Sequence, residues 1–265
     1  MIKKKKLSVI FLCFTLIISL LFGGCARGGA EETVATRAPS ETDCIADNSV
    51  LLQAGEDQGQ EYIDSFIFIG ESTTYHMKSR GVLSGGTDTK QVWAPSNGTI
   101  NLDLTIDTLK IVYPETGELI TISQAAERKK PEYVLLTFGL NGAVQNVKKG
   151  AEYYKSCYSK LTDAILSSSP RTKIIIQAGY PVASNMDMSR YSVDLRGLNS
   201  CIDTVNCWAY EFASERGFAF LDTGSVLKNE NNELKYEYQC GDGYHLTTEA
   251  YRVILQYIRT HPYRT

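Results

Sequence analysis

Four short apolar runs with no polar alternation are the feature that most constrains the fold of this chain. They occupy residues 64–69 (DSFIFI), 133–138 (YVLLTF), 173–178 (KIIIQA) and 218–221 (FAFL). The first three are each followed directly by glycine. Strands that are apolar along their whole length are buried on both faces, which is typical of a parallel sheet between two layers of helices. We therefore predict four buried strands.

Helical patterns separate these runs. Apolar residues recur at helical spacing over residues 150–168 and again over a longer segment that ends before Gly217. Thr247 or Thr248 can cap a last helix, which stops at Pro262. The alternation of strands and helices predicts an α/β fold, a three-layer α/β/α sandwich with a mostly parallel sheet.

Two segments depart from the alternation. Residues 109–122 contain two strand-like runs joined by Pro-Glu-Thr-Gly, which predicts a β-hairpin outside the main sheet. Residues 77–99 are rich in Gly, Ser, Thr and Asp, and we expect an irregular loop there.

The first 24 residues have the pattern of an export signal. Four lysines at residues 3–6 precede an uncharged apolar run over residues 7–22, which is short for a membrane span of roughly 20 residues. The run ends in Gly23-Gly24-Cys25, which resembles the lipobox of bacterial lipoproteins. We expect Cys25 to carry a lipid that holds the protein on the extracytoplasmic face of the membrane. An ordinary cleaved signal peptide and an uncleaved anchor are the alternatives, and both place the protein outside the cytoplasm.

Composition divides the rest of the chain. Residues 25–60 are rich in small and polar residues, so we predict a flexible tether there and one domain over residues 61–265. Removal of residues 1–24 takes away four lysines, which leaves 23 basic and 30 acidic residues and a net charge of −7. This charge argues against nucleic-acid binding, which needs a basic surface.

Cysteine spacing indicates neither a zinc site nor a disulfide framework. Five cysteines remain after Cys13 and Cys25 are set aside: Cys44, Cys157, Cys201, Cys207 and Cys240. Their number is odd and none forms a Cys-x-x-Cys pair. Although export would permit one or two bridges, we predict buried or partly buried thiols, with Cys201 and Cys207 unpaired because they lie on different faces of one helix.

Polar residues follow the predicted strands at the edge where ligands bind in open α/β sheets. Ser72 follows the first strand, Asn141 follows the second, and Asp242 and His245 precede the last helix. A serine hydroxyl needs a base to become a nucleophile, and His245 can accept its proton near neutral pH. Asp242, three residues earlier, can fix the tautomer of the imidazole. The three therefore have the composition of a Ser-His-Asp triad.

Each of these motifs has a structural alternative when it is taken alone. The Gly-x-Ser segment can be an ordinary turn, Asn141 can stabilise a strand-ending turn, and Asp242 with His245 can cap the last helix. The Gly-x-Ser-x-Gly elbow of ordinary α/β-hydrolases is absent, because Thr74 stands where its last glycine would be. The combination of the motifs, in this chain order, is much more specific than any one of them.

Together the motifs resemble those of the SGNH, or GDSL-like, hydrolase family. Residues 62–261 contain Gly-Glu-Ser for the usual Gly-Asp-Ser, then Gly-x-Asn, then Asp-x-x-His. The resemblance implies a flavodoxin-like fold with Ser72 as nucleophile, His245 as base and Asp242 as its orienting acid. It also implies an oxyanion hole formed by the Asn141 side chain and the Ser72 backbone N–H.

Two departures from the family pattern concern Glu71 and a glycine. Glu71 replaces the usual aspartate, which puts little in doubt because that position is outside the triad. The family's glycine that supplies a third oxyanion donor has no clean match, and Gly98 is the candidate. His76, about one helical turn after Ser72, is a candidate for lining the site.

The resemblance implies a serine esterase that hydrolyses short acyl esters, with O-acetyl groups on carbohydrate or cell-wall glycan as the leading substrate. Lysophospholipase, thioesterase and acyltransferase activities are alternatives, as is a catalytically silent surface-binding lipoprotein. We expect a monomer that uses no metal or organic cofactor, because triad chemistry needs none and the three histidines are not spaced as ligands.

Overall fold

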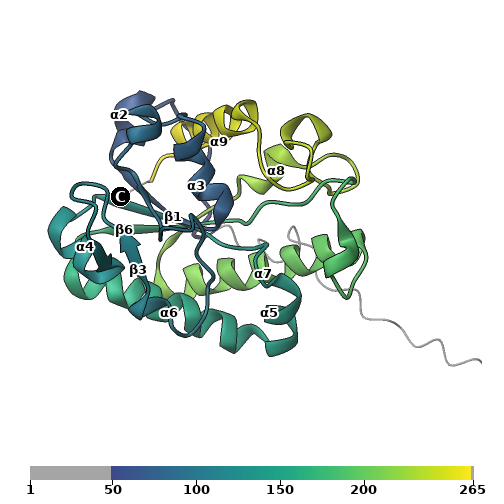
Figure 1. Cartoon of the computed structure of the whole chain (residues 1–265), viewed down its shortest axis with the longest axis horizontal. Helices are drawn as coiled ribbons and strands as arrows, with labels where there is room; N and C mark the ends of the chain where they lie inside the picture. The colour runs from purple at the N-terminus through teal and green to yellow at the C-terminus, as the bar shows by residue number, and fades with distance from the viewer. Residues whose placement is uncertain (1–48, 264–265) are drawn as a thin grey trace, which may run out of the picture. The chain divides into compact units, whose positions relative to one another are not determined.

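The computed structural model describes residues 49–263, and its centre is a five-stranded parallel sheet (Figure 1). The strands are β1 (Phe66–Gly70), β2 (Val92–Trp93), β5 (Tyr133–Thr137), β6 (Lys173–Gln177) and β7 (Ala219–Leu221). They lie in the order β2-β1-β5-β6-β7, and all neighbours pair in parallel. Counted within this sheet the order is 2-1-3-4-5, which is the flavodoxin-like order. The predicted fold class is confirmed.

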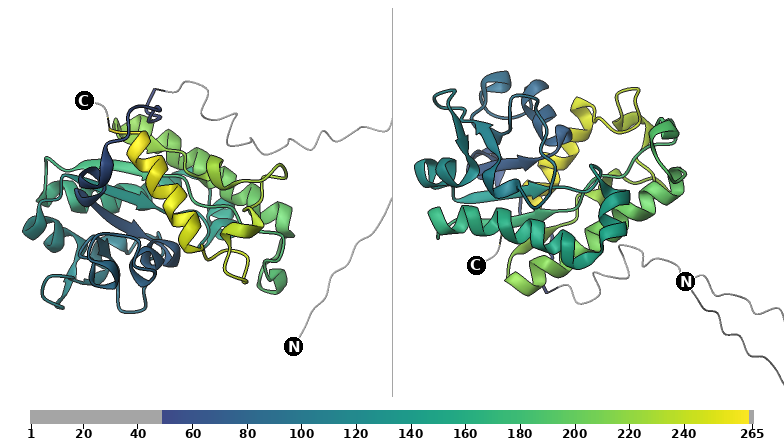
Figure 2. Two further views of the ribbon diagram at one scale, coloured as in Figure 1. Left: turned by 90° about the horizontal axis from the view of Figure 1, so that it is seen from above. Right: turned by 60° about the horizontal axis from the view of Figure 1, so that its bottom comes forward.

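Helices cover both faces of the sheet, as the views of Figures 1 and 2 show. One face is covered by α2 (Gly59–Asp64), α3 (Ser72–Ser79), α8 (Gly224–Leu227) and α9 (Thr248–Thr260). The other is covered by α4 (Ile122–Lys129), α6 (Ala151–Ser168) and α7 (Leu195–Arg216), and α5 (Ala143–Lys149) packs against α7. Single 3₁₀ turns lie at η1 (Gly86–Asp88), η2 (Ile106–Thr108), η3 (Met188–Arg190) and η4 (Tyr236–Tyr238).

Alternate residues of each strand supply two separate cores. In β1, Ile67 and Ile69 pack with α6 and α7, whereas Phe66 and Phe68 pack with α3 and α9. All four side chains are buried. Burying a large apolar side chain stabilises the fold by roughly 1.5–3 kcal/mol, so these strands have no face that could tolerate a polar residue cheaply. This explains why the sequence shows continuous apolar runs.

The predicted excursion is a hairpin of β3 (Lys110–Val112) and β4 (Leu119–Thr121), which pair antiparallel in a separate sheet.

The expectation of an irregular loop over residues 77–99 was partly wrong. Val92 and Trp93 form β2, which pairs with Phe68 and Ile69 of β1 at the edge of the main sheet. Two residues are too few to show a strand pattern in the sequence.

The prediction of a tether that extends to residue 60 was also wrong at its C-terminal end. Phe220 in β7 donates a backbone hydrogen bond to Val50 and accepts one from Leu52, both at 2.8 Å. The N–H of Gly55 donates to the carbonyl of Thr260 at 2.7 Å. The apolar residues 50–52 therefore cover the exposed edge of β7.

The predicted signal segment and Cys25 lie outside the described residues. No helix within residues 49–263 is long and apolar enough to span a membrane.

The described cysteines depart from the prediction of buried or partly buried thiols at two positions, Cys240, which is exposed, and Cys207. Cys157, Cys201 and Cys240 are free, with Cys157 buried, Cys201 partly buried and Cys240 exposed. Cys207 is disulfide-bonded, which corrects the prediction of a thiol at this position. Spacing along the chain carries no information on this bond, because pairing depends on which elements the fold brings together.

Candidate active site

The residues singled out in the sequence lie at the carboxyl ends of the strands. Ser72 is the first residue of α3 and follows β1 after a single intervening residue, Glu71. Asn141 lies in the loop between β5 and α5, and His245 lies just before α9. The strands β1 and β5 are neighbours in the sheet although the chain visits β2 between them. Such a reversal of strand order is where open α/β sheets form their ligand sites.

Ser72, His245 and Asp242 form one continuous hydrogen-bonded line. The Oγ of Ser72 lies 3.0 Å from Nε2 of His245, although 173 residues separate the two along the chain. On the other side of the ring, Nδ1 of His245 lies 2.6 Å from Oδ2 of Asp242. With the ring proton on Nδ1, Nε2 is left free to accept the proton of the serine hydroxyl.

The other oxygen of Asp242 is held by its own loop. Its Oδ1 accepts hydrogen bonds from the backbone N–H groups of Tyr244 and His245, at 3.2 and 3.0 Å. Partial burial works against ionisation, but the hydrogen bonds from His245 and Tyr244 outweigh it and lower the pKa of Asp242. The carboxylate is therefore ionised and fixed in direction when it meets the imidazole.

Two aromatic rings enclose the imidazole of His245. The ring of Tyr244 lies 4.0 Å from it and the ring of His76 lies 4.3 Å from it, measured between ring centroids. Burial lowers the pKa of His76, and repulsion from His245 and Arg80 lowers it further. His76 thus lines the site as an uncharged ring at neutral pH.

The side chain of Asn141 is oriented by a hydrogen bond to a neighbouring loop. Its Nδ2 donates to Oγ1 of Thr99 at 3.1 Å. An amide nitrogen carries two N–H groups, so this bond leaves one of them for another acceptor. Ser72 begins α3, and the first N–H groups of a helix have no acceptor within the helix. Both groups can therefore serve as donors to a negative oxygen.

Gly98 does not present a free donor. Its N–H donates to the carbonyl of Pro95 at 2.9 Å and closes a turn. Its φ of +74° is in the left-handed region, and a Cβ at this position would lie 2.7 Å from the ring of Tyr75. The structure therefore does not support Gly98 as an oxyanion donor. The residue is glycine because this turn packs tightly on α3.

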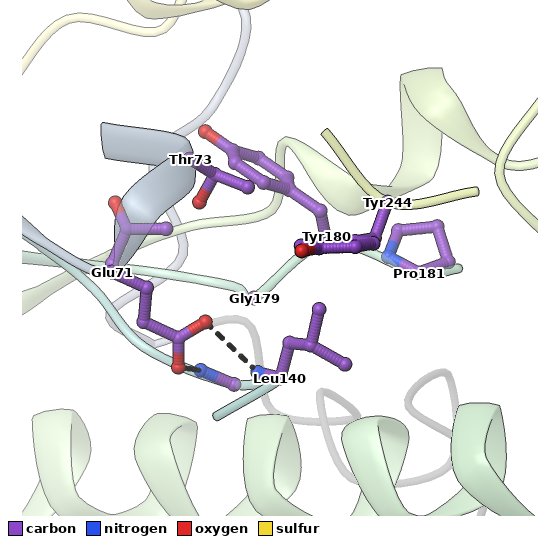
Figure 3. A pocket seen from close by; sticks show the side chains of 9 residues that line it. Glu71, Thr73, Leu140, Gly179, Tyr180, Pro181 and Tyr244 are labelled. Carbon is purple, nitrogen blue, oxygen red and sulfur yellow. Dashed lines mark hydrogen bonds between the residues drawn. The ribbon is translucent and has the colours of Figure 1, made fainter. Parts of the chain in front are cut away.

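Glu71 has a structural role that its position in the sequence did not reveal. Its Oε1 accepts the N–H groups of Gly139 and Asn141, both at 2.9 Å, and its Oε2 accepts that of Leu140 at 3.3 Å. Figure 3 shows the carboxylate directed at this loop. The side chain is 5% exposed, and burial raises the pKa of Glu71 to about 7 against the opposing effect of the three N–H groups. Glu71 therefore joins the segment that carries Ser72 to the segment that carries Asn141.

The floor of the site is formed by two glycines in direct contact. A Cβ on Gly139 would lie 2.7 Å from the Cα of Gly179, and a Cβ on Gly179 would lie 2.5 Å from the Cα of Gly139. The ends of β5 and β6 can approach this closely only because neither residue has a side chain.

A small enclosed cavity adjoins these groups (Figure 3). Its volume of about 10 Å³ is roughly enough for one water molecule. Its lining includes both chain neighbours of Ser72, namely Glu71 and Thr73. It also includes Leu140, next to Asn141, and Tyr244, next to His245.

This arrangement can carry out acyl transfer. It combines an activated hydroxyl, a base with an oriented tautomer and two donors for a developing negative charge. Within residues 49–263, no group of three or more His, Cys, Asp or Glu side chains is placed to hold a metal ion.

Comparison with known proteins agrees with this chemistry. The sequence profile of the GDSL-like lipase/acylhydrolase family matches residues 68–253. No curated protein sequence matches the chain significantly.

Among solved structures, a protein from Streptococcus pneumoniae that is provisionally described as a platelet activating factor is similar. It has 16% identity and a TM-score of 0.50, over 82% of this chain and 88% of that one. A lipolytic protein of the G-D-S-L family, so described provisionally, from Desulfitobacterium hafniense DCB-2 has 15% identity and a TM-score of 0.48, over 72% and 95% of the two chains. A carbohydrate esterase family 3 protein from Talaromyces cellulolyticus has 14% identity and a TM-score of 0.44, over 72% and 92%.

Proposed function

The chain belongs to the GDSL-like lipase/acylhydrolase family and is a serine ester hydrolase, and from this premise we propose that Ser72, His245 and Asp242 are its catalytic triad. The observation that carries the proposal is the line from Ser72 Oγ through His245 to Asp242, at 3.0 and 2.6 Å. We further propose that the substrate is a short acyl ester, an O-acetyl group on a carbohydrate or a cell-wall glycan.

The first half of the reaction forms an acyl-enzyme. Oγ of Ser72 attacks the ester carbonyl carbon while Nε2 of His245 takes the hydroxyl proton. The carbonyl oxygen becomes an oxyanion, which accepts hydrogen bonds from the Asn141 amide and the Ser72 backbone N–H. The bond to the alcohol then breaks as His245 returns its proton to the departing alkoxide. Asp242 stabilises the imidazolium that exists between these steps.

The second half releases the acyl group. A water molecule gives a proton to Nε2 of His245 and attacks the carbonyl carbon of the acyl-serine. The same donors hold the second oxyanion, and its collapse returns the proton from His245 to Oγ of Ser72. Ester and water are thus converted to carboxylic acid and alcohol, and the enzyme is restored.

The small cavity favours a short acyl group. Its volume of about 10 Å³ has room for a group about as large as one water molecule, and the bulky side chains of Leu140, Tyr180 and Tyr244 are part of its lining. A long acyl chain would need a tunnel of several hundred Å³. This favours O-acetyl esters over lysophospholipids and over the thioesters of long-chain acids.

The proposed location rests on the N-terminal sequence. Four lysines, an apolar run and Gly23-Gly24-Cys25 support export and lipidation at Cys25. Metabolic labelling with a fatty-acid analogue should place a lipid on the wild-type protein and none on Cys25→Ala. Labelling of both proteins, or of neither, would contradict the anchor while leaving the esterase proposal standing.

Covalent labelling tests the nucleophile. The wild-type protein should react with a fluorophosphonate and should release acetate from p-nitrophenyl acetate, whereas Ser72→Ala should do neither. Ser79→Ala is the matched control, because Ser79 is an exposed hydroxyl on the same helix, and it should behave as wild type. Wild-type protein that neither labels nor turns over any ester would favour a silent binding protein.

Esters of increasing chain length test the substrate class. Acetyl esters should be turned over fastest, and activity should fall steeply beyond about four carbons. Faster turnover of lysophospholipid would favour the lysophospholipase alternative. Transfer of the acetyl group to an added sugar in preference to water would favour the acyltransferase alternative.

A further inference from the structure

A second, larger groove lies beside the proposed oxyanion hole. It has a volume of about 470 Å³, within the usual size range of small-molecule sites. One wall is the loop that follows β2, with Asn97, Thr99 and Asn101. The other is the β3–β4 hairpin, with Lys110 and Leu119. Neither the triad nor the small cavity uses these residues.

We propose that this groove binds the carbohydrate part of the ester, so that the acyl group enters the small cavity while the sugar chain lies along the loop 95–105. The proposal rests on the proposed esterase function and extends it by assigning the site of the alcohol portion. The ligand class is a neutral oligosaccharide with O-acyl substituents.

A hydrogen bond joins the groove to the catalytic residues. Thr99 lines the groove, and its Oγ1 accepts the hydrogen bond from Nδ2 of Asn141. The turn at Gly98, next to Thr99, packs on the ring of Tyr75, which lies three residues after Ser72 on α3. A ligand in the groove would therefore contact Thr99, which is hydrogen-bonded to the residue proposed to hold the oxyanion.

The polar groups of the groove suit hydroxyl groups. Asn101 is exposed, and no hydrogen bond to its side chain is found within residues 49–263. Asn97 is also exposed, and its Oδ1 accepts the N–H of Thr99 at 3.3 Å, which leaves its Nδ2 available. An amide offers both donors and acceptors, as a sugar hydroxyl does.

The apolar groups of the groove suit the C–H faces of sugar rings. Leu109 and Leu119 line the hairpin side, and Leu119 is 57% exposed. The two leucines give the hairpin side an apolar surface on which the C–H face of a sugar ring can pack. The mixture of exposed leucine and exposed amides matches the amphipathic surface of a sugar chain better than that of a lipid tail.

The charges of the groove argue against an anionic polymer. Lys110 and Asp103 are the charged residues of its lining, and they are opposite in sign. Asp103 is occupied by its own loop, because its Oδ1 accepts the N–H and the hydroxyl of Thr105 at 2.8 and 2.6 Å. A polyphosphate would meet no net positive charge here.

Two variants of Asn101 test the proposal on the full-length protein. Asn101→Ala removes one hydrogen-bonding group, and Asn101→Trp fills the groove. Both should keep kcat/KM on p-nitrophenyl acetate within about twofold of wild type. On neutral O-acetylated xylan oligosaccharides, Asn101→Ala should lose about tenfold in kcat/KM, the effect of one ordinary hydrogen bond, and Asn101→Trp should lose more.

Asn231→Ala is the matched control, because Asn231 is an exposed asparagine in a turn outside the groove. It should equal wild type on every substrate. Titration of wild-type protein with the deacetylated oligosaccharides should show binding that Asn101→Trp abolishes.

The possible failures are distinguishable. Unchanged glycan activity in Asn101→Trp, or equal losses on both substrate types, would overturn the groove proposal while the esterase proposal stands. Absence of fluorophosphonate labelling and of p-nitrophenyl acetate turnover in the wild type would overturn the proposed function itself.

Discussion

The side chain of Glu71 accepts the backbone N–H of Asn141 at 2.9 Å. The residue next to the proposed nucleophile thus holds the residue proposed to stabilise the oxyanion. The same carboxylate accepts the N–H groups of Gly139 and Leu140. The turn after β5 is therefore hydrogen-bonded to the residue that precedes α3. This buried side chain therefore helps to fix the position of the Asn141 backbone relative to the Ser72 hydroxyl.

Replacing Glu71 should damage catalysis without removing a reacting group. In Glu71→Gln one oxygen can still accept from Gly139 and Asn141, but an amide N–H₂ faces the N–H of Leu140. We expect kcat to fall roughly tenfold with KM nearly unchanged, because the oxyanion donor shifts while ground-state binding does not. Steady-state kinetics on p-nitrophenyl acetate measure this. Wild-type kcat in Glu71→Gln would show that the three hydrogen bonds do not position Asn141.

Glu71 should also make stability depend on pH. Burial raises its pKa from 4.5 to about 7 in the folded state, so the folded protein binds this proton more tightly than the unfolded chain does. The protonated side chain therefore makes its full contribution to the free energy of unfolding below pH 4.5. This contribution is lost as the pH rises through about 7, which lowers the free energy of unfolding by about 3 kcal/mol. Glu71→Gln mimics the protonated form and should lack this slope. Urea unfolding of both proteins at pH 5 and pH 8 checks the difference, and parallel pH dependence in the two would refute it.

Asn141→Ala should be severe for activity and mild for stability. The loss of one oxyanion donor costs about 10²–10³ in kcat. The side chain is only partly buried, and within residues 49–263 it bonds to one other side chain, that of Thr99, so the melting temperature should fall by a few degrees at most. Thr99→Val removes the acceptor and keeps the shape, and we expect it to lose about tenfold in kcat. A Thr99→Val effect as large as that of Asn141→Ala would mean that Asn141 acts only through this bond.

Asp242→Asn should separate hydrogen bonding from charge. The asparagine Oδ1 can still accept the N–H groups of Tyr244 and His245, so the loop should persist. Its amide nitrogen would face Nδ1 of His245, place the ring proton on Nε2 and prevent that atom from accepting the serine proton. A loss in kcat on the order of 10³–10⁴ is expected. Asp194→Asn is the control, because Asp194 caps α7 by accepting the N–H of Gly197, and it should retain full activity. Comparable losses in both variants would point to a structural effect.

The central strands and the hydrogen-bonded line of Ser72, His245 and Asp242 were predictable because their signals are local. Burial on both faces produces continuous apolar runs, and each reacting residue lies within a few positions of a strand end or of the last helix. The helix ends were also readable, since Thr247 caps α9 and Gly217 ends α7 as their residue types suggest.

The features that escaped prediction depend on contacts between distant segments. Glu71 hydrogen-bonds to residues 68 to 70 positions away, and the sequence marks only that it replaces an aspartate. The two-residue strand β2 forms because the edge of β1 has free backbone groups with which it can pair. Residues 50–52 are held in the same way by backbone hydrogen bonds to the edge of β7. Gly98 matched a family position in distance along the chain, but its N–H is used within its own turn.

The contact between Gly139 and Gly179 makes the catalytic geometry sensitive to a single methyl group. An alanine at either position would act as a wedge that forces the ends of β5 and β6 apart. Because the N–H of Gly139 is bonded to Glu71, the displacement would pass to the turn that carries Asn141. Activity could therefore vanish in a protein whose reacting groups are all intact.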